Sequence, residues 1–120
     1  MTGAAAQPAE PVDLALALER VLGDKVLLAR VLARFRDEYR GAARAIGAAH
    51  AAGELEEARR QAHTLKGAAA MIGATALHRE ALALELRLRE RSHESAAQLA
   101  RLESELERVM RSLDEMLDAG

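Results

Sequence analysis

Residues 54–73 read ELEEARRQAHTLKGAAAMIG, and the spacing of the apolar residues in this stretch decides the fold. These residues recur in steps of three and four, which predicts one buried face of an α-helix. Gly73 follows at the place where a residue with left-handed backbone commonly ends a helix. The apolar positions are Leu55, Ala58, Ala62, Leu65, Ala69 and Ile72.

The same periodicity continues upstream of this helix. Asp24 is a candidate cap for one long helix that runs to the turn at Gly53. A shorter helix is expected within residues 12–22, with Asp13 as its candidate cap. The predicted buried positions are Leu14, Leu18 and Val21 in the short helix, and Leu28, Val31, Leu32, Phe35, Tyr39, Ala42, Ile46 and Ala49 in the long one.

Two further amphipathic helices are predicted downstream. Thr75 and Ser92 are their candidate caps, and charged residues separate the apolar positions of the last helix. The inward positions are Leu77, Ala81, Leu84 and Leu88 in the first, with Leu82 and Leu86 widening its apolar face, and Leu99, Leu102, Leu106, Val109, Leu113 and Met116 in the second.

Four long helices with short connections predict an all-α fold, an antiparallel up-down-up-down four-helix bundle with a short extra N-terminal helix. Its expected extent is residues 12–120, and residues 1–11 are expected to form a flexible tail or linker. The length of 120 residues fits one domain.

Composition excludes several classes of function. The chain has no cysteine, a formal net charge of −2, and one phenylalanine and one tyrosine as its only aromatic residues. Thiolate chemistry is therefore excluded, and nucleic-acid binding is not expected without a basic, aromatic surface. We expect no signal peptide and no membrane span, which predicts a cytoplasmic protein. Two lysines against many arginines hint at a GC-rich bacterial genome.

His63 is the residue whose position suggests chemistry. On a helical wheel it lies about 130° from the core stripe of its helix, so we expect it to face solvent. Its predicted neighbours are Arg59, Lys66, Gly67 and Ala70, with Arg60 nearby. A neutral imidazole offers a lone pair to a phosphoryl group, and positive charge beside it suits such a group and an acidic partner.

Gly67 is unusual at mid-helix, where glycine costs about 1 kcal/mol against alanine. Bare backbone there would let another protein approach the imidazole closely. The plainer interpretation is a solvated histidine on an ordinary charged face with a tolerated glycine. For His50, His78 and His93 we expect no role beyond the surface or its boundary. None of the four histidines pairs with another at helical ligand spacing, so no metal site is predicted.

The stretch from Ala62 to Ala74 resembles the signature of histidine-containing phosphotransfer (HPt) domains. That signature is a histidine, Leu65-Lys66-Gly67, and a second glycine ten residues after the histidine. Leu77, the Leu84-Glu85 pair, Leu22-Gly23-Asp24 and Phe35 also stand where the family has similar residues. The resemblance covers roughly residues 12–117.

The resemblance implies a phosphorelay carrier that binds no ATP and is not an enzyme in the usual sense. His63 would accept the phosphoryl group, Lys66 would help to neutralise it, Gly67 would give a partner access, and Gly73 would end the helix. The implied partners are response-regulator receiver domains, which bring a phosphorylatable aspartate and Mg²⁺, and a hybrid sensor histidine kinase is a further candidate. We expect no cofactor of the chain's own, contacts to the partner through Arg59, Arg60 and Ala70, and a monomer.

The sequence leaves three alternative functions to weigh. The phosphoacceptor segment of a sensor kinase usually has an acidic residue after its histidine and a proline a few residues later. Here Thr64 follows, and no proline occurs after Pro11. A non-catalytic helical adaptor that binds a receiver would need neither the histidine nor the lysine. A metal-binding bundle lacks paired ligands.

Overall fold

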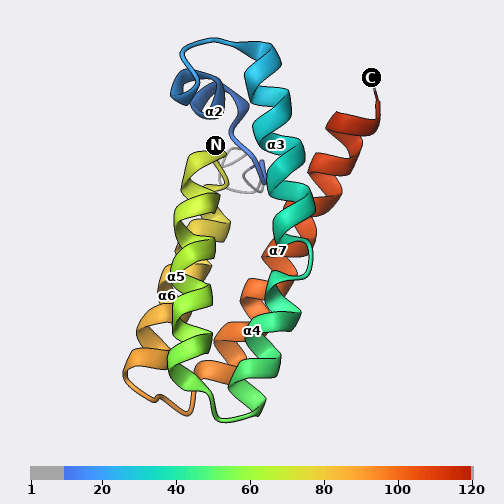
Figure 1. Ribbon diagram of the computed structural model, residues 1–120. Coiled ribbons are helices and arrows are strands. Elements are labelled where there is room, and N and C mark those ends of the chain that lie inside the picture. The colour runs from blue at the N-terminus through green and yellow to red at the C-terminus, as the bar shows by residue number, and fades with distance from the viewer. Residues whose placement is uncertain (1–9, 120) are drawn as a thin grey trace, which may run out of the picture.

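The computed structural model describes residues 10–119, and within them every regular element is an α-helix (Figure 1). Only Glu10 and Pro11 of the predicted tail fall inside this range. The all-α prediction is confirmed. The helices are α2 (Leu14–Arg20), α3 (Lys25–Tyr39), α4 (Ala42–Ala51), α5 (Leu55–Met71), α6 (Thr75–Arg89) and α7 (Ser95–Asp118).

The first long arm of the bundle consists of two helices, α3 and α4, rather than the single helix predicted. A turn at Arg40 and Gly41 separates them, and α4 begins at Ala42, where Gly41 in the capping position offers no side-chain hydrogen bond. Glycine in a helix interior is destabilising because it loses more backbone freedom on folding, which favours a break there. Figure 1 shows α4 continuing in the general direction of α3, so α3–α4, α5, α6 and α7 form the four arms.

The core is built largely from leucine and alanine. On α5 the buried residues Ala58, Ala62 and Ala69 alternate with Leu65, and all four are fully buried. Small side chains allow neighbouring helices to approach closely, which brings surface residues of α5 and α6 within reach of one another. The predicted core face of each long arm is confirmed, with Leu28, Val31, Tyr39, Leu55, Leu99 and Met116 partly buried around it.

The short helix α2 rests on the turn between α5 and α6 at one end of the bundle (Figure 1). Asp13 caps α2 through its carboxylate, which accepts from the amide of Leu16, and its own amide donates to the carbonyl of Gly73 at 2.9 Å. Gly73 has φ +73°, and a Cβ there would lie 2.5 Å from the Asp13 carbonyl oxygen. Both its conformation and this contact require glycine.

Several local predictions are wrong. Leu14 is exposed, and Ala17 is the buried residue of α2, because only a small side chain fits so close to the Gly73 turn. Thr75 is the first residue of α6 rather than its cap. The hydroxyl of Ser92 accepts from the amide of Glu94 in the turn before α7, so it organises the turn and does not cap the helix. The cap predicted at Asp24 is confirmed.

Ion pairs join the first and last arms of the bundle. Arg36 contacts Asp118 at 3.0 Å and Asp114 at 3.3 Å, and Arg40 contacts Asp114 at 2.6 Å. These contacts link α3 to α7 at a partly exposed seam. Among the described residues, none of the helices combines the length and apolarity that crossing a membrane requires.

Candidate functional site

His63 lies in the middle of α5, with its side chain 61% exposed. Its ring is nevertheless held on one side, because Nδ1 lies 2.9 Å from Oε2 of Glu85 on α6. The two residues are 22 positions apart and meet because α5 and α6 are antiparallel neighbours. The imidazole is thus accessible to another molecule and fixed in orientation.

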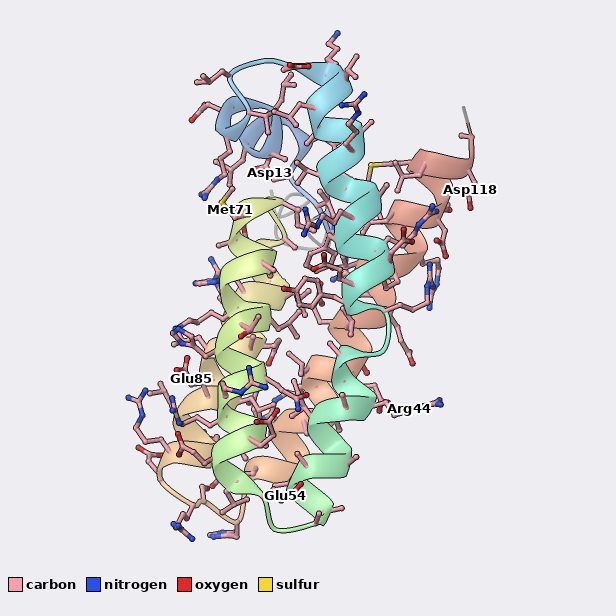
Figure 2. All side chains as sticks on the ribbon, in the orientation of Figure 1. Asp13, Arg44, Glu54, Met71, Glu85 and Asp118 are labelled. Carbon is pink, nitrogen blue, oxygen red and sulfur yellow. The ribbon has the colours of Figure 1, made fainter. Side chains whose placement is uncertain are left out.

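Glu85 is the centre of this site. Its side chain is only 3% exposed, although it lies next to the surface (Figure 2). Four basic groups surround it: Nδ1 of His63, Nζ of Lys66 at 2.8 Å, and the guanidinium groups of Arg89 at 3.4 Å and Arg59 at 3.7 Å. A buried carboxylate is tolerated when it is paired in this way.

The surrounding cations decide the charge state of Glu85. Burial on its own raises the pKa of the carboxyl, but contacts with Lys66 and His63 more than offset this, so the pKa lies below the ordinary value of 4.5. The group is therefore an ionised carboxylate near neutral pH. An ionised carboxylate only accepts hydrogen bonds, so Nδ1 of His63 carries the proton in this contact. That leaves Nε2, on the other side of the ring, as the nitrogen that can act as a nucleophile.

The predicted basic patch is present only in part. Lys66 and Arg59 contact the carboxylate of Glu85, and Arg59 also pairs with Glu56. Arg60 does not join them. It is bound to Glu57 on its own helix, and its side chain is 64% exposed. The structure thus places Arg59 beside His63 and Arg60 in a separate ion pair.

The surface of α5 beside His63 carries only small residues at Gly67 and Ala70. Gly67 is exposed, and a Cβ built there would have nothing within 4 Å, so the glycine is not required for packing within this chain. Ala70, one turn further along α5, is partly exposed. Behind them, Nδ1 of His78 on α6 lies 3.1 Å from the carbonyl oxygen of Lys66, to which it donates. His78 therefore ties the two helices together beside the site.

Sequence reasoning missed three residues of this site. The sequence pattern includes Glu85 only as part of a Leu-Glu pair, and it predicts no place in the site for Arg89 or His78. Their distance along the chain from His63 hides the contact. One signal was available, because Glu85 is a charged residue directly beside Leu84 on the buried face of its helix.

A family comparison agrees with this geometry. The family model of the Hpt domain matches residues 30–119, three quarters of the chain. The chain belongs to the Hpt domain family. Hpt domains carry out histidine phosphotransfer in two-component phosphorelays and interact with receiver domains and kinases. Comparison with curated proteins and with solved structures gives no significant match.

The Hpt match begins within α3, so α2 and the turn that follows it lie outside the matched range. His63, Lys66 and Glu85 all lie inside it. Among residues 10–119, no group of three or more His, Cys, Asp or Glu side chains could hold a metal ion.

Proposed function

We propose that this Hpt domain is a phosphorelay carrier that accepts a phosphoryl group on His63 from a receiver aspartate and passes it to another receiver aspartate. The observation that carries the proposal is the contact between His63 and the buried carboxylate of Glu85 at 2.9 Å. A solvated surface histidine needs no such partner. Orientation of an imidazole by a hydrogen-bonded carboxylate is a recurrent way of preparing it for nucleophilic work.

Because the proton of the His63 ring is on Nδ1, the other ring nitrogen, Nε2, carries out the transfer step. Nε2 of His63 attacks the phosphorus of the aspartyl phosphate, a nitrogen–phosphorus bond forms, and the bond from phosphorus to the aspartate oxygen breaks. The aspartate leaves as a carboxylate, while the Nδ1 proton stays hydrogen-bonded to Glu85. The ring then carries positive charge beside an ionised carboxylate, which stabilises it. Onward transfer is the reverse of this step at a second receiver.

Lys66, whose side chain is 22% exposed, would help to neutralise the phosphoryl oxygens, because phosphoryl transfer depends mainly on positioning and charge. Arg59 would contribute from the neighbouring turn. We propose that the receiver supplies the Mg²⁺ ion together with its aspartate. Gly67 and Ala70 would leave room for the receiver surface. A cytoplasmic location and a monomeric state remain predictions.

The test is transfer of radiolabelled phosphoryl from a panel of receiver domains, each first charged with acetyl phosphate. Wild type should become labelled through a bond that is acid-labile and alkali-stable, and His63→Gln should stay unlabelled. The exposed His93, in the turn before α7, provides a matched control, and His93→Gln should be labelled like wild type. Label on His63→Gln would disprove the assignment of the residue.

A non-catalytic adaptor would give a different pattern. It would bind receivers but take no label from any of them, and His63→Gln would bind as well as wild type. A receiver panel that binds without transferring to wild type would therefore replace the carrier function with that of an adaptor.

A further inference from the structure

Leu82 and Leu86 are two large apolar side chains that α6 leaves exposed to solvent. They are 38% and 43% exposed, and they lie one turn apart on α6. Within residues 10–119, the exposed large apolar side chains occur on α2, in the turn after α2, in the first turn of α3, at the end of α5, and on α6. None of them lies on α4 or α7. Exposed apolar surface is thus confined to part of the molecule, which includes the helix that faces His63.

The two leucines flank the site of His63. Two contacts fix the alignment of the helices, from His63 to Glu85 and from the Lys66 carbonyl to His78. Leu82 lies between Glu85 and His78 along α6, and Leu86 directly follows Glu85. Around the helix they lie about 60° and 100° beyond Glu85, further from the core stripe. They therefore lie on the solvent-facing side of α6, next to the line of contact between α5 and α6 and beside the imidazole.

We infer that Leu82 and Leu86 are the apolar contacts by which this chain holds the receiver domain during transfer. The inference rests on the proposed function. A donor aspartate must bring its phosphorus to bonding distance of His63, so the receiver surface necessarily covers the surroundings of the ring. A standard interface buries about 800 Å² on each partner, which corresponds to a circle of about 16 Å radius. Both leucines lie within about 5 Å of Glu85 along the axis of α6, well inside that circle.

Charge favours the same partner. Lys66, Arg59 and Arg89 surround the buried carboxylate of Glu85, and Arg59 also pairs with Glu56. Three basic side chains therefore face two acidic ones beside the leucines. A receiver brings a phosphorylated aspartate, and the complementary surface is therefore apolar with an acidic centre. Complementary charge at the centre gives such a complex specificity and fast association, and the leucines add apolar contact beside it.

The test replaces both leucines by glutamine, which keeps the helix propensity and the net charge. The receiver is the member of the panel that labels wild type fastest, and transfer is measured over a range of receiver concentrations. We expect KM to rise about tenfold while the rate at saturating receiver stays within about twofold. As a control, Val26→Gln removes a 67% exposed apolar side chain at the start of α3 and should leave KM unchanged.

Three results of the transfer assay would overturn the inference: an unchanged KM in the double variant, an equal rise in KM for Val26→Gln, or a fall in the saturating rate alone. A fourth is a wild-type dimer, seen by analytical ultracentrifugation, that the double variant does not form. The last would assign the leucines to contact between copies of the chain. Circular dichroism checks folding, and if the double variant is unfolded, Leu86→Gln alone carries the test. Absence of transfer to wild type from every receiver would instead refute the proposed function.

Discussion

Replacing Glu85 by glutamine tests the central contact of the site. Glutamine has nearly the same shape, so packing around this 3% exposed side chain is retained and only the charge is removed. Two of the four basic groups lie within 3.0 Å of the carboxylate, His63 and Lys66. A hydrogen bond or ion contact to a charged group is worth about 1 kcal/mol more than a neutral one, so the two together lose about 2 kcal/mol.

Burial of the carboxylate offsets part of this loss, because the neutral amide is easier to bury. The pKa of Glu85 is lowered overall, which means that its partners outweigh burial and that the net effect of the substitution is destabilising. We therefore expect a loss of about 1 kcal/mol in the free energy of unfolding at neutral pH, or a fall in Tm of about 4 °C.

The dependence on pH gives this prediction its sharpest form. A carboxyl group whose pKa is lower in the folded state stabilises the fold above its unfolded-state pKa. That stabilisation is lost as the pH falls through the folded-state value, which lies below 4.5 for Glu85. The difference in the free energy of unfolding between wild type and Glu85→Gln should therefore be largest near pH 7 and decrease as the pH falls.

Thermal unfolding followed by circular dichroism between about pH 7 and pH 3 measures this difference, because the range extends well below 4.5. A variant as stable as wild type at pH 7, or a difference that does not change with pH, would refute the reasoning. Labelling of His63 should also slow, by roughly fivefold if about 1 kcal/mol of orientation is lost.

Three further predictions follow from the same structure. Gly67→Ala should raise the free energy of unfolding by up to about 1 kcal/mol in chemical denaturation, because the new Cβ would meet open space. The same substitution should slow phosphoryl transfer from a receiver, and faster transfer would exclude close approach of the partner at this position. Gly73→Ala should destabilise the fold by more than about 2 kcal/mol in the same assay, since φ is +73° and the new Cβ would lie 2.5 Å from the Asp13 carbonyl oxygen; a loss below about 0.5 kcal/mol would contradict this account of the turn. Lys66→Gln should reduce the rate of phosphoryl transfer at saturating receiver by about tenfold while leaving labelled His63 detectable, and an unchanged rate would remove Lys66 from the chemistry.

The fold was largely predictable because periodicity reports directly on burial. The stripe from Ala58 to Ile72 is buried throughout, as its spacing indicates. Helix ends were less predictable. Ser92 and Thr75 have cap-forming side chains, but neither is the capping residue of its helix. Thr75 is already the first residue of α6, and α7 begins three residues after Ser92, at Ser95, because the geometry of each turn decides which residue comes first.

The site was predictable on one helix only. The exposed position of His63 followed from its angle on the wheel, and Lys66 from its spacing on the same face. The contact with Glu85 depends on how far α6 is rotated and shifted against α5, which no local pattern encodes. The same holds for Leu82 and Leu86, which the pattern assigned to a widened apolar face and the structure exposes.

The tight turn at Gly73 limits how the chain can change in length. His63 lies ten residues before Gly73 and Glu85 twelve after it, which is about 15 Å and 18 Å of helix. A single residue inserted between Ile72 and Thr75 would rotate α6 by about 100° or shift it by about 1.5 Å, and the carboxylate would leave the imidazole. Insertions should therefore be tolerated in the turns at residues 52–54 and 90–94, while the hairpin between His63 and Glu85 has a fixed length.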